Sequence, residues 1–321
     1  MNKIIAAAVA SCLAISIPFS SSVNAQSMHT LQSLADATPN AEPYAGKVMW
    51  FARHWTEYGV VSYSSAVRLN KYWGITAAHA VEAPGTPPDM FTVGTGSNWM
   101  TDPGETREIV EYITYPGWVG VWDGTAVDLA VIRWEEPLEG EDLEIGALSL
   151  GEMFEYVGYA KPATPATGML PNDGKRRVFD AKVNGWGMSS GQVSTDYSKS
   201  TFYPPGSPNY IAMGGVGTGG GSGSPGFNQD GKLVALLVAQ SSTPDYGGAS
   251  FGLRLDLYAD WIAEKTYVAP PVDPPHHPPY AICLLHHHYY HLMHAGAAST
   301  TLAHIRRKCL PSILSSHSVV H

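Results

Sequence analysis

The sequence predicts an all-β protein that ends in one helix, and three observations support this fold class. Charged residues make up only 15% of the chain, whereas glycine (33 residues) and proline (24 residues) are plentiful, as in proteins built from many strands and turns. Short apolar runs recur between turn signals, which is typical of strands. Only 256–265 has the apolar spacing of a helix, with Asp256 as its expected N-cap.

In the first half of the chain, regular structure is expected to begin near Tyr44. The apolar or alternating runs there predict strands at 47–51, 59–63, 65–69, 72–76, 108–115 and 125–134. Between them, 85–108 holds Pro, Gly, Asp and Asn, and is expected to be a long loop.

The acidic, turn-rich stretch 135–150 is expected to link two halves of the domain. In the second half, the runs at 156–159, 177–183, 232–239 and 250–255 predict strands. A long polar loop is expected from Asn184-Gly185-Trp186-Gly187 to Asn209.

The first 25 residues have the features of an export signal. Lys3 supplies a positive start, 4–17 is apolar, and Val23-Asn24-Ala25 fits a cleavage site before Gln26. The alternative is a membrane anchor, although the apolar run is short for a membrane span. We therefore expect a secreted protein, periplasmic or extracellular, with no stable membrane span. Residues 26–43 are polar, and predict a propeptide or a loose N-terminal arm.

The net charge of −9 argues against nucleic acid as a partner. Cys12 lies in the expected signal, and Cys283 and Cys309 lie near the end, where pairing within or between chains stays open. The body of the protein has no cysteine, so it must be stabilised by packing alone.

The most distinctive stretch is the glycine-rich segment 213–227. It contains the pattern Gly-x-Ser-Gly-x-Pro from Gly220 to Pro225, with Ser222 at its centre. Small neighbours leave a serine hydroxyl accessible, and glycines let successive N–H groups converge where an oxyanion can form. The alternative is a flexible glycine linker.

Two further residues could serve that serine. His79 lies between small alanines at the end of the strand at 72–76, where its ring can be held rigidly, although a buried structural histidine is the alternative. Asp128 opens an apolar strand and needs a hydrogen-bond donor there, which an imidazole N–H would supply. An ordinary turn aspartate is the alternative.

These motifs resemble those of trypsin-like (chymotrypsin-fold) serine peptidases of the secreted bacterial type. The similar elements are the histidine region 64–79, the aspartate strand 128–133, the serine loop 220–225, Gly185-Trp186-Gly187 and the terminal 258–262. The resemblance covers about 46–265 and implies a peptidase domain at 44–267. It also implies two antiparallel six-stranded β-barrels with the active site between them.

The resemblance further implies a serine endopeptidase that acts on proteins or peptides. His79, Asp128 and Ser222 would be the catalytic residues, and the N–H groups of Gly220 and Ser222 would form the oxyanion hole. It implies no cofactor and no metal, and we expect a monomer. The alternatives are a pseudo-peptidase that binds partners without cleaving them, and an esterase that uses the same residues.

The sequence departs from the family's pattern at Gly221. The family usually has an aspartate there, which pairs with a new N-terminal amine and orders the oxyanion loop, so this loop must be ordered differently. Val216, six positions before Ser222, would form the floor of the substrate side-chain site. An apolar floor predicts small or medium apolar side chains there, rather than Lys or Arg.

Beyond the peptidase domain, 268–279 predicts a stiff proline-rich linker. The tail 280–321 is expected to be disordered. Ten of the thirteen histidines lie from His276 onward, and we expect only adventitious metal binding there. The abrupt change in composition also fits a frameshifted reading of the gene.

Overall fold

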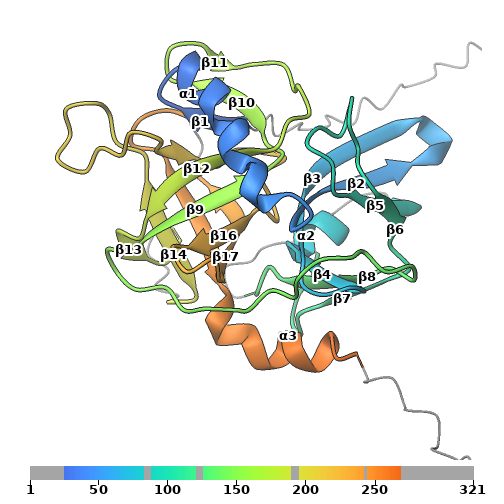
Figure 1. Ribbon diagram of the computed structural model, residues 1–321. Helices are drawn as coiled ribbons and strands as arrows, with labels where there is room; N and C mark the ends of the chain where they lie inside the picture. The colour runs from blue at the N-terminus through green and yellow to red at the C-terminus, as the bar shows by residue number, and fades with distance from the viewer. Residues whose placement is uncertain (1–24, 83–87, 121–125, 189–194, 242–243, 269–321) are drawn as a thin grey trace, which may run out of the picture. The chain divides into compact units, whose positions relative to one another are not determined.

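The strands of the first half form a curled antiparallel sheet in the computed structural model (Figure 1). The structure describes residues 25–82, 88–120, 126–188, 195–241 and 244–268. The strand order in this sheet is β6-β5-β2-β3-β4-β8-β7. Its strands are β2 (Val48–Trp55), β3 (Val60–Arg68), β4 (Trp73–Thr76), β5 (Met90–Gly94), β6 (Thr106–Glu108), β7 (Glu111–Thr114) and β8 (Ala130–Arg133).

The second half forms another antiparallel sheet, with the order β12-β9-β16-β17-β18-β14-β13. Its strands are β9 (Met153–Gly158), β12 (Arg177–Lys182), β13 (Gly185–Trp186), β14 (Tyr197–Thr201), β16 (Pro225–Asn228), β17 (Leu233–Gln240) and β18 (Ala249–Arg254). The all-β prediction is confirmed. Each curled sheet has seven strands in the described part of the chain, whereas six were expected.

A third, four-stranded sheet combines the first described residues with three strands from the second half of the chain. Its order is β11-β10-β1-β15, so β1 is an inner strand. The strands are β1 (Ala25–Met28), β10 (Lys161–Thr164), β11 (Gly168–Met169) and β15 (Gly215–Val216). The helix α1 (Leu31–Ala37) and the 3-10 helix η1 (Pro39–Tyr44) then lead to β2.

The expectation that regular structure begins near Tyr44 was therefore wrong. Met28, Leu34 and Ala37 belong to a buried apolar cluster together with Phe179 and Leu237 of the second half. The four-residue strand and the seven-residue helix are too short for their periodicity to stand out in the sequence.

Two expected loops also contain strands. β5 and β6 lie within 85–108, and β14 lies within the polar stretch before Asn209. β14 was not predicted because its buried positions include two serines, Ser198 and Ser200, so it lacks an apolar pattern. The Ser198 hydroxyl donates to the Gly252 carbonyl at 3.1 Å. A serine whose hydroxyl is hydrogen-bonded can be buried in a strand, so a buried strand does not need an apolar pattern.

The chain's last described element is a helix, as expected, but Asp256 does not cap it. A 3-10 turn, η3 (Leu255–Tyr258), comes first, and α3 (Ala259–Lys265) follows it. The Asp256 carboxylate instead accepts a hydrogen bond from Arg254 at 2.8 Å. Trp261 of α3 packs against Tyr115 of the first half, with ring centroids 5.1 Å apart.

The expected signal peptide (1–24 of it), most of the linker and the histidine-rich tail lie outside the described residues. In the described ranges, no helix is both long enough and apolar enough to cross a membrane.

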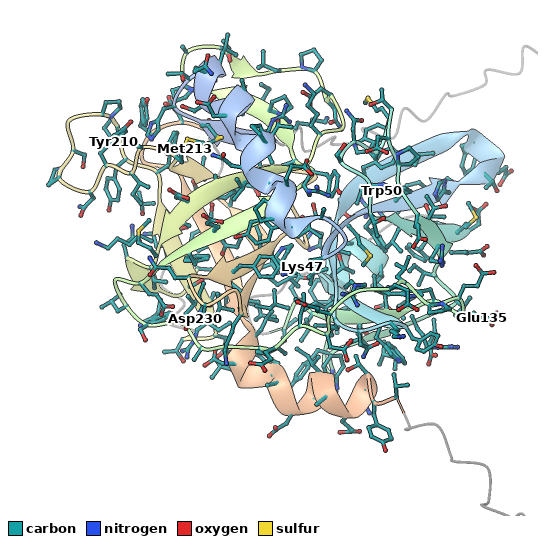
Figure 2. All side chains as sticks on the ribbon, viewed as in Figure 1. Lys47, Trp50, Glu135, Tyr210, Met213 and Asp230 are labelled. Atoms are coloured by element: carbon teal, nitrogen blue, oxygen red, sulfur yellow. The ribbon has the colours of Figure 1, made fainter. Side chains whose placement is uncertain are left out.

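The segment after β1 is anchored by His29, which is 7% exposed. Its ring packs against Phe202 and Tyr210, with centroids 4.7 and 4.6 Å away, and its Nε2 donates to the Ile211 carbonyl at 2.7 Å. Tyr210 is labelled in Figure 2, on the loop that precedes β15. Burial lowers the pKa of His29, although the bond to Ile211 acts in the opposite direction.

A pH dependence of stability follows from this buried imidazole. Because its pKa is lower in the folded state, His29 stabilises the fold fully above about pH 6.5, its ordinary value, and this contribution is lost as the pH falls through the folded pKa. We expect the free energy of unfolding to fall more between pH 7.5 and pH 5.0 in the native sequence than in His29→Phe, measured by urea titration. Equal losses in both proteins would contradict this role.

Candidate active site

His79 lies just after β4, in a single helical turn, α2 (Ala78–Val81). Ala78 and Ala80 on either side are buried, so their methyl groups fix the turn, while about a third of the His79 side chain is exposed (34%). The Arg53 guanidinium also donates to the His79 carbonyl at 3.3 Å. The ring is thus held by its neighbours and remains open to solvent on one side.

Asp128 lies two residues before β8, which pairs with β4. The register places Thr76 opposite Ala130, so His79 and Asp128 meet at the same end of the two strands. The Asp128 carboxylate is almost fully buried and accepts two hydrogen bonds, from the His79 backbone N–H at 2.9 Å and from the His79 ring Nδ1 at 2.6 Å. A buried charge needs such partners.

Ser222 completes the group from the second half of the chain. Its Oγ lies 2.7 Å from Nε2 of His79. A carboxylate only accepts hydrogen bonds, so its contact with Nδ1 assigns the imidazole proton to that nitrogen and leaves Nε2 to accept from the Ser222 hydroxyl. In this tautomer the imidazole can remove the hydroxyl proton as the oxygen attacks a carbonyl.

The loop that carries Ser222 consists of two tight turns. The Gly221 N–H donates to the Thr218 carbonyl at 2.8 Å, and the Ser224 N–H donates to the Gly221 carbonyl at 2.9 Å. The third residues of these turns, Gly220 and Gly223, have φ values of 78° and 80°. Glycine is strongly favoured in that left-handed region, which explains the density of glycine in the sequence.

The N–H groups of Gly220 and Ser222 have no acceptor in the part of the chain that the structure describes. A free pair of N–H groups beside a nucleophile is what an oxyanion hole requires. The side chain missing at Gly221 also has a physical reason here, because a Cβ would lie 2.5 Å from the Thr218 carbonyl oxygen. An aspartate does not fit at this position without a change in the turn.

Ser65, a buried residue of β3, connects the first half of the chain to this loop. Its N–H donates to the Ser222 carbonyl at 2.9 Å, and its hydroxyl donates to the Gly220 carbonyl at 3.2 Å. The same hydroxyl accepts from the Tyr159 N–H at 3.0 Å, and the Ser65 carbonyl accepts from the Thr76 hydroxyl at 2.8 Å. Ser65 therefore fixes the backbone on both sides of Gly221.

Val216 lies in β15 and is fully buried, with its backbone opposite Ser27 of β1. One residue further on, the Gly217 N–H donates to the Ser250 hydroxyl at 2.8 Å. The side chain of Leu237, from β17, occupies the space that a Cβ on Gly217 would need. The residue that follows Val216 thus lies against one apolar side chain, Leu237, and one hydroxyl, Ser250.

Of the predicted residues, His79 lies within hydrogen-bond distance of both Asp128 and Ser222, and Gly220 lies two residues before Ser222 in the same loop. Ser65, Leu237 and the N-terminal strand were not predicted to belong to the site. The serine pair Ser64-Ser65, directly before the apolar Ala66-Val67 of the predicted strand, was the signal available for Ser65. Across the described residues, no group of three or more side chains suits a metal ion.

No protein-family model matches the sequence, and no curated protein matches it. Solved structures do match. The inactivated protease paralogue S-I1 of the scabies mite matches with a TM-score of 0.50 and 15% identity, over 68% of this chain and 93% of that chain. HL collagenase matches with a TM-score of 0.54 and 13% identity, over 70% of this chain and 95% of that chain.

At such low identities the likeness concerns the fold alone, and one of the two proteins is described as inactivated. The two curled antiparallel sheets and the C-terminal helix agree with this likeness of fold. The chain therefore has a chymotrypsin-like fold, the fold of serine protease homologues.

Proposed function

We propose that the protein is a secreted serine endopeptidase that hydrolyses peptide bonds through Ser222, His79 and Asp128. The hydrogen-bonded series from the Asp128 carboxylate through the His79 ring to the Ser222 hydroxyl carries this proposal. The bonds measure 2.6 and 2.7 Å, within the range at which an imidazole accepts a hydroxyl proton. The sequence features of the first 25 residues support export.

In the proposed reaction, the Ser222 oxygen attacks the carbonyl carbon of the substrate as His79 Nε2 takes the hydroxyl proton. The N–H groups of Gly220 and Ser222 receive the negative charge on the carbonyl oxygen. His79 then returns the proton to the leaving amine, which leaves an acyl-enzyme. A water molecule, deprotonated by the same imidazole, attacks the acyl carbon, the bond to Ser222 Oγ breaks, and His79 returns the proton to Oγ as the acid leaves. Asp128 stabilises the imidazolium in each half of the cycle.

A non-cleaving binding protein is the second candidate, because one structural neighbour is described as an inactivated protease paralogue. An esterase would use the same residues. Hydrolysis of a small ester alone does not separate an esterase from a peptidase, because an acyl-enzyme forms with both substrates, so a peptide substrate is needed in every test.

The substrate side chain next to the cleaved bond is proposed to be small and apolar. Val216 and Leu237 are apolar and buried, and the stretch 213–227 contains no charged residue. A lysine or arginine side chain buried against them would lose its hydration without gaining a counter-charge.

The first prediction concerns the nucleophile. A fluorophosphonate should label the processed protein at Ser222, as mapped by mass spectrometry. The labelled protein should no longer hydrolyse a protein substrate. Ser222→Ala should lose both. The neighbouring Ser224→Ala serves as the matched labelling control, because the Ser224 side chain is buried and the serine bonded to His79 is Ser222. A folded native protein that is neither labelled nor active would support the binding-protein alternative.

The second prediction concerns specificity. In peptides that differ only at the residue before the cleaved bond, we expect kcat/KM with Ala or Val to exceed that with Lys or Arg by about a hundredfold or more. Leu237→Ala should shift the preference toward larger apolar residues, because it removes the side chain that fills the space beside Gly217. A native preference for Lys or Arg would refute the apolar site.

The third prediction concerns Ser65. Ser65→Ala removes the hydroxyl that bridges Gly220 and Tyr159, so we expect kcat to fall by about ten- to a hundredfold with little change in KM, since loss of a buried hydrogen bond costs roughly 1–3 kcal/mol. Ser64→Ala is the matched control, because the neighbouring buried Ser64 hydroxyl has no partner among the described residues. Equal effects of the two substitutions on kcat would mean that Ser65 has no special role.

A further inference from the structure

The N-terminal strand β1 lies between the two segments that support the oxyanion loop. On one side it pairs in parallel with β10, from Ala25 opposite Lys161 to Ser27 opposite Ala163. On the other side it pairs antiparallel with β15, with Ser27 opposite Val216 and Met28 opposite Gly215. β10 and β15 have no pairing with each other in the described sheet, so β1 alone joins them.

Both neighbours of β1 are directly connected to the loop. β15 ends at Val216, and the loop begins at the next residue. β10 begins at Lys161, whose N–H donates to the Gly219 carbonyl and whose carbonyl accepts from the Thr218 hydroxyl, both at 3.4 Å. Without β1, the strand that leads into the loop, β15, would lose its partner in the described sheet, and β10, which contacts the outer turn of the loop, would be paired with β11 alone.

The rest of the arm is anchored in the core that underlies the loop. Met28 and Leu34 are buried in the same apolar cluster as Leu237, whose side chain packs against Gly217 and Gly221. The Arg177 guanidinium donates to the Leu34 carbonyl at 3.4 Å. The Ser27 hydroxyl donates to the Pro244 carbonyl. The arm is thus an integral part of the second half of the protein.

No charged side chain of the loop can take over this function. From Met213 to Phe227 the sequence contains no acidic, basic or histidine residue, and Gly221 has no room for a Cβ. The loop therefore depends on backbone pairing and packing from outside its own sequence.

From these contacts we propose that residues 26–37 are not a discarded propeptide but a permanent part of the working enzyme, and that insertion of β1 between β10 and β15 positions the oxyanion loop. This inference rests on the proposed peptidase function. The arm acts through the N–H groups of Gly220 and Ser222, so it is a positioning element and does not touch the substrate.

The first test is the N-terminus of the active species. The secreted protein is labelled with a fluorophosphonate probe, and the labelled fraction is analysed by mass spectrometry. We expect labelled chains to begin at Gln26, or at least to retain 27–37. Labelled chains that begin at Thr38 or later would overturn the inference. Absence of labelling in the native protein would instead refute the proposed peptidase function.

The second test compares two proline substitutions in the full chain. Ser27→Pro interrupts an inner strand, where proline removes a ladder hydrogen bond. Leu31→Pro lies four residues later, at the first position of α1, where proline is tolerated and the side chain is 58% exposed. We expect kcat to fall a hundredfold or more in Ser27→Pro, the loss typical of an oxyanion-hole donor, and to stay within about twofold in Leu31→Pro.

A spectroscopic readout separates loss of the loop from loss of the whole fold. We expect the short hydrogen bond between His79 Nδ1 and Asp128 to give a far-downfield proton resonance in NMR, and this bond lies where β4 and β8 of the first sheet meet. In Ser27→Pro we expect this resonance to persist while peptide hydrolysis and labelling are lost. Native kcat in a Ser27→Pro protein would overturn the inference. If that variant does not fold, the N-terminus of the labelled native chains decides alone.

Discussion

The absence of any charge in the stretch 213–227 is the constraint on which the rest of the site depends. Two backbone N–H groups must point to one place beside Ser222, and no ion pair of the loop itself can hold them there. The loop is instead fixed by hydrogen bonds that its neighbours supply: the Ser65 N–H and hydroxyl, the Ser250 hydroxyl, and the Leu237 carbonyl, which accepts from the Gly223 N–H at 2.8 Å. Each of these hydrogen bonds contributes about 1 kcal/mol net to stability, so the conformation of the loop depends on all of them together.

This arrangement couples the two sheets. His79 and Asp128 are held at the end where β4 and β8 meet, whereas Ser222 is held by the loop and by its contacts with β17. Ser65 belongs to β3, the strand next to β4, and it contacts the loop on both sides of Gly221. The position of the hydroxyl relative to the imidazole is therefore set by direct hydrogen bonds between the sheets and not by the covalent chain. A substitution remote from the triad in sequence can still change the Ser222–His79 distance.

The sequence allowed the all-β fold class and most buried strands to be predicted, because apolar runs such as 72–76 and 232–239 survive as β4 and β17. The three side chains His79, Asp128 and Ser222 were also identifiable, since His79 and Ser222 lie among small residues and Asp128 opens an apolar strand. Elements that depend on tertiary partners were missed. β1 has only four residues and becomes a strand because two other strands accept it, and β14 is polar along much of its length. The hydrophobic pattern of a short segment does not show which other strands will pair with it.

The low sequence identity to the structural neighbours fits this contrast between local pattern, which can be read from the sequence, and tertiary contacts, which cannot. Identities of 13% and 15% are compatible with a common fold, because a curled antiparallel sheet demands alternating burial and suitable turns and not particular residues. Chemistry is more demanding, because it depends on a few hydrogen bonds at fixed positions. In this chain Gly221 excludes the side chain that usually orders the loop, and β1 occupies an inner position beside that loop. The fold can therefore be shared while the contacts that order the loop around Ser222 differ, and in our proposal backbone pairing with β1 supplies that order.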